Sequence, residues 1–247
     1  MKKEQVISKM NPLLFQGICH RGYHNERDTE NGLKAFQNAI DHHMAFELDV
    51  HLTKDNRLVV IHDSETKRVT GKDGIIEEMT LEEIKNGYRL LDGEEIPTLE
   101  EVLDLTNEQV PIVVELKAYQ NNNRKLAKQA QIELSKIKDP KNILIISFDP
   151  RALLFMGKRF IRQLLVAHDN KHEFTFRFAF LFEGVDLDMK FLKEEKYQNY
   201  QKKHVVNCWT IETIEQFEEV LPHCDTVTFQ SFDCETVKEK LSERNKH

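Results

Sequence analysis

The sequence has no apolar run long enough to cross a bilayer, and its four cysteines show no CxxC spacing. A membrane-spanning helix needs about 20 consecutive apolar residues, and zinc fingers need cysteines or histidines at short, fixed spacings. Both classes of protein are therefore excluded. The cysteines are expected to be buried reduced thiols rather than disulfides. They are Cys19, Cys208, Cys224 and Cys234.

The start of the chain also lacks the pattern of a secretory signal. The charged residues in 1–5 are followed by a short apolar stretch, which Asn11 and Pro12 interrupt before the first predicted strand. A signal peptide needs a continuous apolar segment. Together with reduced cysteines, this predicts a cytoplasmic protein.

Positive charge is not in excess either. Lys and Arg number 35 against 42 Asp and Glu, which gives a formal net charge of −7. Proteins that bind nucleic acids broadly present a basic face that replaces phosphate counterions. We therefore expect no nucleic-acid partner, and we expect any phosphate that the protein binds to be held locally with the help of a metal ion.

What the sequence does contain is an alternation of short apolar segments and helical patterns. Strand-length apolar segments occupy 15–19, 46–50, 58–61, 112–114, 143–146, 164–167, 205–208 and 226–229, and helical spacing occupies 31–42, 122–137 and 213–221. Apolar strands separated by helices are typical of a parallel sheet covered on both faces. Seven or eight such units predict an α/β protein with one domain, residues 1–247, folded as a (β/α)8 TIM-like barrel. A doubly wound open sheet is the alternative.

A polar segment interrupts the alternation after the second strand. Residues 63–97 contain Gly71, Gly74, Gly87 and Gly93, and they predict a small insertion within about 51–100. Three Thr-x-x-Glu/Gln boxes predict helix starts, because the two side chains satisfy free backbone donors reciprocally. The boxes are Thr80 with Glu83, Thr98 with Glu101, and Thr213 with Gln216.

Phenylalanine occurs at every second position from 174 to 182. Strict alternation favours a half-buried strand, whereas Phe174, Phe178 and Phe182 would also share one face of the helix that a barrel requires here. These side chains either pack in the core or form an apolar wall or lid against a lipid-like substrate. The sequence leaves both questions open.

Polar clusters end or follow four of the apolar segments. They are His20-Arg21-Gly22, Glu47-Leu48-Asp49, His62-Asp63 and Glu115-Leu116-Lys117. The carboxyl ends of parallel strands converge at one edge, so these clusters are predicted to form a single site. Residues two apart in a strand point to the same side, and each Glu-x-Asp or Glu-x-Lys pair is therefore presented together.

Three acids of this site, Glu47, Asp49 and Glu115, are predicted to bind a divalent metal ion. Clustered carboxylates without a cation repel one another and raise their own pKa values. Oxygen donors without a nearby cysteine suit Mg²⁺ or Ca²⁺. For one Glu-x-Asp pair alone, an ordinary salt bridge would be the simpler interpretation.

The site also contains two histidines and two cations. Imidazole titrates near neutrality, so His20 and His62 are candidates for a general acid and base. Arg21 and Lys117 supply the fixed positive charge that an anionic phosphoryl group needs. The set favours phosphodiester cleavage over glycoside hydrolysis, which needs only two carboxylates.

The other nine histidines are expected on the surface or in loops. They include His42 and His43. His51 is also placed in this group, although it shares a strand face with Asp49.

At these residues the sequence resembles the glycerophosphodiester phosphodiesterase family. The resemblance is dense over 18–118 and thinner to about 210, and its motifs are His20-Arg21-Gly22, Thr29-Glu30-Asn31-Gly32, Glu47-Leu48-Asp49-Val50, Thr53-Lys54-Asp55, His62-Asp63, Arg68-Val69-Thr70-Gly71, Ile96-Pro97-Thr98-Leu99-Glu100-Glu101, Glu115-Leu116-Lys117, Ser147-Phe148-Asp149 and Val206-Asn207-Cys208-Trp209-Thr210. The resemblance implies a TIM-like barrel whose insertion lies over the site. It implies His20 and His62 as the acid/base pair, Glu47, Asp49 and Glu115 as metal ligands, Arg21 and Lys117 as phosphate ligands, and Trp209 near the bound alcohol.

Two departures from the family pattern bear on the site. A glycine that the family has before the second strand is replaced by His43, which adopts positive φ less readily. The family's Thr-Asp-x-Pro near the end of the chain is Thr228-Phe229-Gln230-Ser231 here.

The implied activity is metal-dependent hydrolysis of a small-molecule glycerophosphodiester to glycerol 3-phosphate and an alcohol. One alternative is a lysophospholipase D-like activity on lysophospholipids, suggested by the phenylalanines. Another is a non-catalytic barrel that binds a phosphorylated ligand, suggested by the altered last motif. The headgroup, the ion, the nucleophile, the acid and base roles and the oligomeric state stay open.

Overall fold

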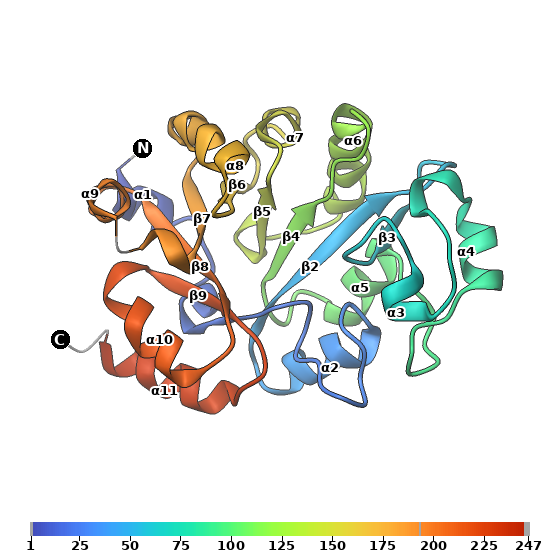
Figure 1. Ribbon diagram of the computed structural model, residues 1–247, viewed down its shortest axis with the longest axis horizontal. Helices are drawn as coiled ribbons and strands as arrows, with labels where there is room; N and C mark the ends of the chain where they lie inside the picture. Colours follow the sequence, from blue (N-terminus) through green and yellow to red (C-terminus); the bar gives the residue numbers. More distant parts are fainter. Residues whose placement is uncertain (1, 193, 245–247) are drawn as a thin grey trace.

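The strands of the protein close into a barrel. The computed structural model describes residues 2–192 and 194–244 (Figure 1). Its strands are β1 (Ile18–Cys19), β2 (Ala45–Leu52), β3 (Leu58–Val60), β4 (Ile112–Leu116), β5 (Ile143–Ser147), β6 (Ile161–Val166), β7 (Gly184–Asp188), β8 (Val205–Ile211) and β9 (Thr226–Phe229). Strand β1 pairs in parallel with both β2 and β9, which joins the two edges of the sheet. Strand β3 is antiparallel to β2 and lies outside the ring, so eight parallel strands form the predicted closed barrel rather than an open sheet.

Helices connect the consecutive parallel strands of the barrel and cover its outside (Figure 1). The α-helices are α1 (Lys3–Ile7), α2 (Leu33–Asp41), α3 (Lys67–Thr70), α4 (Leu81–Gly87), α5 (Leu99–Thr106), α6 (Asn123–Leu134), α7 (Pro150–Phe155), α8 (Asn170–Thr175), α9 (Glu195–Gln201), α10 (Ile214–Val220) and α11 (Cys234–Arg244). The 3₁₀ helices are η1 (Pro12–Gln16), η2 (Ile76–Glu78), η3 (Pro140–Asn142), η4 (Phe176–Leu181), η5 (Met189–Phe191) and η6 (Leu221–His223). Within residues 2–192 and 194–244, no helix has both the length and the apolar character that a bilayer crossing requires.

The predicted helix starts are confirmed. Helices α4 and α5 begin directly after Thr80 and Thr98, and both capping boxes are formed. Helix α10 begins after Thr213, whose hydroxyl accepts from the Gln216 N–H at 3.3 Å. The Gln216 side chain instead accepts from the Glu212 N–H, so only half of this third box is present.

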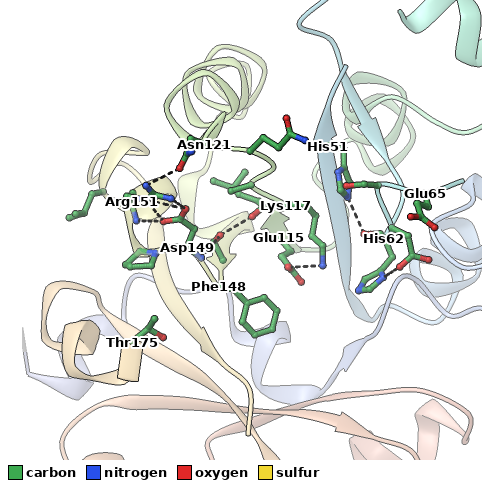
Figure 2. Close-up of a pocket in the computed structure, with 18 of the residues that line it drawn as sticks. His51, His62, Glu65, Glu115, Lys117, Asn121, Phe148, Asp149, Arg151 and Thr175 are labelled. Carbon is green, nitrogen blue, oxygen red and sulfur yellow. Dashed lines mark hydrogen bonds and ion pairs between the residues drawn. The ribbon is translucent and has the colours of Figure 1, made fainter. Parts of the chain in front are cut away.

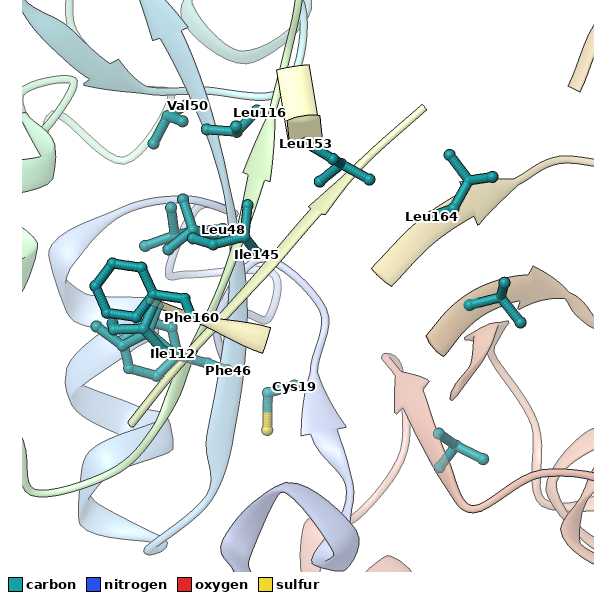
Figure 3. Packing of buried hydrophobic residues seen from close by; sticks show 14 of the residues in the cluster. Cys19, Phe46, Leu48, Val50, Ile112, Leu116, Ile145, Leu153, Phe160 and Leu164 are labelled. Carbon is teal, nitrogen blue, oxygen red and sulfur yellow. The ribbon is translucent and has the colours of Figure 1, made fainter. Parts of the chain in front are cut away.

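Strand β2 shows how the sequence divides the barrel interior from the helix layer. Phe46, Leu48 and Val50 are buried in the main apolar core, which also contains residues of α2 (Figure 3). Phe46 stacks on Phe36 of α2 with ring centroids 4.7 Å apart. Because side chains alternate along a strand, Glu47 and Asp49 point the other way, into the barrel.

The amino-terminal segment closes one end of the barrel. Val6, Met10 and Leu14 pack with apolar residues from the inner face of the strands. The expected strand at 15–19 is wrong over its first half, because residues Pro12–Gln16 form η1. Asn11 caps this turn by accepting from the Leu13 N–H, and Pro12 occupies its first position, where a proline fits best. At the opposite end, residues at the carboxyl ends of the strands line open hollows.

The predicted insertion after the second strand is present as β3, α3, η2 and α4. It has a small apolar core of its own, built from Val59, Ile61, Val69, Ile76, Ile84, Leu90 and Ile96. This core fixes the insertion as a compact unit beside the open end of the barrel.

One strand was not predicted from the sequence, and one open question is answered by the structure. Strand β7 was not predicted, because Asp186 and Asp188 interrupt its apolar pattern. The phenylalanine-rich segment is helical, as α8 and η4, rather than a strand. Phe182 is buried and Phe176 packs on Tyr197 and Tyr200, whereas Phe174, Phe178 and Phe180 are exposed.

Candidate active site

The segment His20-Arg21-Gly22 has a backbone shape that explains its sequence. Arg21 and Gly22 have φ of +55° and +83°, and a Cβ on residue 22 would lie 2.8 Å from the carbonyl carbon of Ala35. Only glycine fits there. The turn is fastened on both sides, because the His20 N–H donates to the Phe229 carbonyl and the Arg21 N–H donates to Glu47 Oε2, at 2.9 and 3.0 Å.

Three buried acids meet inside the barrel. Asp49 of β2 and Glu115 of β4 are direct neighbours across the sheet, and Glu47 lies two residues from Asp49 on the same face. One carboxylate oxygen of each lies within 4.8 Å of the others. Burial, and then the charges of Asp49 and Glu115, raise the pKa of Glu47 well above its ordinary value. Burial likewise raises the pKa of Glu115.

This donor set fits a hard divalent cation. Glu47 Oε1 is buried without a hydrogen-bond partner among the described residues. A cation at this point would supply the missing partner and remove the repulsion between the acids. The three residues predicted as metal ligands are therefore brought together.

Two cations lie against the acids. Lys117 Nζ is 2.9 Å from Glu115 Oε1 and 3.4 Å from Asp49 Oδ1, and Arg21 Nε is 3.4 Å from Asp49 Oδ2. Although burial opposes it, Lys117 and Arg21 lower the pKa of Asp49 well below its ordinary value. Asn31 also donates to Asp49 Oδ2 at 3.0 Å. Asp49 is therefore ionised, and the site holds fixed positive charge next to the proposed metal position.

Both predicted catalytic histidines are oriented through Nδ1. His20 Nδ1 lies 2.6 Å from Gln230 Oε1, and His62 Nδ1 lies 2.6 Å from Asp63 Oδ1. The Gln230 amide nitrogen donates to Glu212. This contact orients the Gln230 side chain so that its amide oxygen faces His20. Nδ1 is therefore the protonated nitrogen of both rings, and Nε2 is the nitrogen available for proton transfer.

The two histidines differ electrostatically. Burial and then the charge of Arg21 lower the pKa of His20 to about 4. Burial, and then the charges of Lys117 and Arg21, also lower the pKa of His62, but the carboxylates of Asp49 and Asp63 oppose that shift. His20 is therefore neutral near pH 7, and His62 is better placed to carry a proton.

An ion-pair network connects the insertion to both histidines. Arg68 of α3 donates to Asp63 Oδ2 at 2.6 Å and to both oxygens of Glu30. Glu30 in turn accepts from Arg21 at 2.8 Å. These contacts lower the pKa of Glu30 to about 2 despite its burial. The insertion thus helps to hold Asp63, the partner of His62, in place.

Two connected hollows open onto the site. The inner one, about 140 Å³, is lined by His20, His62, Glu47, Glu115 and Trp209 among others. The outer cleft, about 1310 Å³, shares His62 and Glu115 with it, and Figure 2 shows Glu115 and Lys117 paired beside Phe148. Trp209 donates to the Asp186 carbonyl and meets Phe148 edge-on, with ring centroids 5.7 Å apart. All predicted site residues except Asp49 line these hollows, and Asp49 lies directly behind them, against Lys117 and Arg21.

Four residues that support the site were not singled out from the sequence. Three of them, Asn31, Asp63 and Gln230, lie within motifs that the sequence shares with or compares to the family. The spacing of these motifs in the chain does not indicate which side chain each residue contacts. Asp186 lies on the strand that was not predicted. One expectation is corrected: His51 is buried rather than on the surface, with Nδ1 2.6 Å from Glu77 and Nε2 3.0 Å from the His62 carbonyl. It supports the segment that carries His62.

Asp186 is a buried carboxyl group at the floor of the site. It is 1% exposed, and its only side-chain hydrogen bond within the described part of the chain comes from Asn207, at 3.1 Å. Burial raises its pKa from 3.8 to about 7. The folded protein holds this proton more tightly than the unfolded chain does. Its contribution to the free energy of unfolding is therefore complete below about pH 4 and is lost as the pH rises to about 7.

We expect Asp186→Asn to raise the free energy of unfolding at pH 8 by about 2 to 4 kcal/mol, and by much less at pH 5, because the amide stays neutral. Urea unfolding of the metal-free protein at the two pH values measures the difference. Asp104→Asn, at an exposed position of α5, is the control and should change little at either pH. Equal stabilisation at pH 5 and pH 8 would contradict this account of Asp186.

A closed parallel barrel with acids, cations and two histidines at the carboxyl ends of its strands defines a TIM-barrel protein with one polar site at that end. Comparison with known proteins identifies the family. The glycerophosphoryl diester phosphodiesterase family matches residues 20–210, and the chain belongs to this family.

Individual relatives agree with this assignment. The chain is 34% identical over 153 residues to a glycerophosphodiester phosphodiesterase of Bacillus altitudinis, which covers 57% of this chain and 61% of the relative. It is 32% identical over 144 residues to the human protein named lysophospholipase D GDPD1, which covers 53% of this chain and 42% of that protein. The chain thus spans about half the length of these curated relatives.

A solved structure extends the similarity over most of the chain. The glycerophosphodiester phosphodiesterase of Parabacteroides distasonis superimposes with a TM-score of 0.77 at 26% identity. The superposition covers 92% of this chain and 97% of that one. The barrel and its order of strands are therefore shared with the family.

Proposed function

We propose that this chain is a metal-dependent phosphodiesterase that hydrolyses glycerophosphodiesters to glycerol 3-phosphate and an alcohol. The observation that carries the proposal is the buried triad of Glu47, Asp49 and Glu115 beside two histidines whose Nδ1 atoms are already held. Membership of the glycerophosphoryl diester phosphodiesterase family supports it. We further propose that it acts as a single cytoplasmic domain, since its four cysteines are buried and form no disulfide within the described residues.

Glu47, Asp49 and Glu115 would hold the metal ion, which we propose to be Mg²⁺ or Ca²⁺. When bound, the ion polarises a phosphoryl oxygen and offsets the charge that builds on it. Arg21 and Lys117 would contact the remaining phosphoryl oxygens, because both carry fixed charge beside the acids.

We assign the proton transfers from the environments of the two imidazoles. His20 is neutral near pH 7 and has a neutral amide on Nδ1, so it would take the proton from the attacking hydroxyl through Nε2. The pKa of His62 is lowered overall, but the Asp63 carboxylate on its Nδ1 favours the charged form, so we assign the protonation of the leaving alcohol to His62. Trp209, which lines the inner hollow, would contact the alcohol.

Product analysis tests the proposed function. Purified protein with Mg²⁺ or Ca²⁺ should release glycerol 3-phosphate from glycerophosphocholine and from glycerophosphoethanolamine, as measured with a glycerol-3-phosphate dehydrogenase assay. Release of phosphocholine instead would place the cleavage on the other side of the phosphorus. No turnover with either ion would favour a barrel that binds phosphorylated ligands without catalysis.

A second candidate function uses the same chemistry on lysophospholipids. Leu154, Phe178 and Leu181 line the outer cleft and would contact an acyl chain. The name of the human relative, lysophospholipase D, supports this substrate class. Comparing kcat/KM for lysophosphatidylcholine and for glycerophosphocholine decides between the two: a higher value for the acylated substrate would make the lysophospholipid the preferred class.

A further inference from the structure

The exposed apolar side chains of this protein are gathered in one place. Eight large apolar residues are exposed in the described part of the chain, and six of them lie on α7 and on the adjoining segments α8 and η4. We call these six the aromatic rim: Leu154, Phe155, Phe174, Phe178, Phe180 and Leu181. Soluble proteins rarely gather so many large apolar side chains at one place without an interaction partner.

The segment that carries most of the aromatic rim is fixed to the barrel by other side chains. In η4 only Ala179 is buried, and the segment is fixed to the barrel by Phe176, which packs on Tyr197 and Tyr200, and by the buried Phe182 that follows. Phe174 and Phe180 are left 58% and 73% exposed. The exposure therefore comes from how the helix is anchored and not from a loose segment.

The rim continues into the outer cleft of the proposed active site. Leu154, Phe178 and Leu181 line that cleft together with Lys117 and Glu115. Helices α7 and α8 stand next to each other beside α6 at one side of the molecule (Figure 1), and Figure 2 shows Thr175 of α8 at the border of the cleft. A surface that covered the rim would thus lie at the entrance to the site.

The charge around the rim is positive, although the whole chain carries −7. Arg177 lies over the Phe174 ring, 4.7 Å from its centroid, and Arg124 of α6 lies 5.9 Å from the centroid of Phe155. In the described part of the chain neither arginine forms an ion pair.

Three carboxylates in or next to these segments are paired with basic side chains. Glu173 pairs with Lys196, Asp149 with Arg151, and Glu183 with Arg162. These three carboxylates therefore do not compensate Arg124 and Arg177, the cations that lie on the rim side chains.

Exposed apolar side chains, arginines that lie on them and the mouth of the outer cleft thus occur together. We propose that the aromatic rim docks on the surface of an anionic lipid bilayer. Phenylalanine side chains would enter the boundary between headgroups and acyl chains, and Arg124 and Arg177 would meet lipid phosphates. A second copy of the chain is a poorer match, because it would bring an equally cationic rim against this one. The docking does not depend on the proposed function. Only its use, in which a lipid substrate would pass from the membrane into the outer cleft, rests on the proposed function.

The test is flotation of the full chain with phosphatidylcholine vesicles that contain or lack phosphatidylglycerol. We expect binding to the anionic vesicles that weakens with added salt. The double variant Phe174→Ser/Phe180→Ser should lose about tenfold or more in vesicle affinity, because two apolar side chains no longer enter the interface. Arg177→Glu should weaken binding to anionic vesicles by about tenfold and change binding to neutral vesicles little.

Leu91→Ser is the matched control, since Leu91 is an exposed apolar residue of the insertion, and it should bind as the wild type does. Phe174 and Phe180 do not line the cleft, so the double variant should keep wild-type turnover of water-soluble glycerophosphocholine. Vesicle binding without turnover of any phosphodiester would overturn the proposed function and leave the docking intact. Absence of vesicle binding, or equal binding by the double variant, would overturn the docking. Self-association in the ultracentrifuge that the double variant abolishes, without vesicle binding, would assign the rim to a second copy.

Discussion

His20→Ala and His62→Ala are each expected to lower kcat for glycerophosphocholine by about 10² to 10⁴-fold, because each removes one proton-transfer group. Neither ring contributes to the apolar core, and each is held through a single Nδ1 contact, to Gln230 or to Asp63. The folded structure should therefore survive both substitutions. The two variants should also differ in their pH dependence, since His20 would act in its neutral form and His62 in its charged form.

Steady-state kinetics and the pH profile of kcat/KM measure these effects, with circular dichroism to verify folding. His223→Ala, in η6 away from both hollows, is the matched control and should keep wild-type turnover. A near-wild-type rate in either active-site variant would remove that histidine from the mechanism.

Chelation of divalent metal with EDTA is expected to abolish turnover, and Glu47→Gln is expected to weaken metal binding by at least about 100-fold. The same substitution should stabilise the metal-free protein, because it removes one member of a group of buried, mutually repelling acids. Metal binding requires ionised Glu47, whose pKa burial raises, so protons compete with the metal and affinity should rise with pH.

Titration calorimetry measures the affinity for Mg²⁺ or Ca²⁺, which Glu47→Gln should weaken. Thermal unfolding with and without the ion measures the stability of the metal-free protein, which the same substitution should raise. Glu82→Gln, an exposed acid of α4, is the control and should behave as the wild type in both measurements. Full activity in EDTA, or an unchanged metal-induced rise in Tm for Glu47→Gln, would defeat the metal assignment.

The sequence predicts the barrel well where strands are apolar throughout. The strand over 226–229 is found at those residues, and the capping boxes place the starts of α4 and α5. Strand β7 was not predicted, because Asp186 interrupts the continuous apolar run that a parallel strand otherwise shows. The Asp186 side chain points into the polar interior of the barrel. The first strand was predicted to begin too early. Asn11 and Pro12 favour a 3₁₀ turn, and this turn includes the apolar residues that directly follow them.

The site follows from the sequence more completely than the fold does. Strand periodicity alone places Glu47 beside Asp49, and parallel strands bring Glu115 to the same end. The partner of His20 does not follow, because its contact with Gln230 joins residues 210 positions apart. His43 confirms one backbone expectation, since it adopts a φ of +51° at the position where the family has glycine.

Strand β1 is only two residues long and is hydrogen-bonded between β2 and β9. His20 directly follows it and takes its backbone and ring contacts from Phe229 and Gln230. During synthesis on the ribosome, these contacts of His20 would form only after residues 229 and 230 had emerged, later than every proposed metal ligand. A nascent chain that already held the proposed metal ligands would therefore still lack a positioned His20.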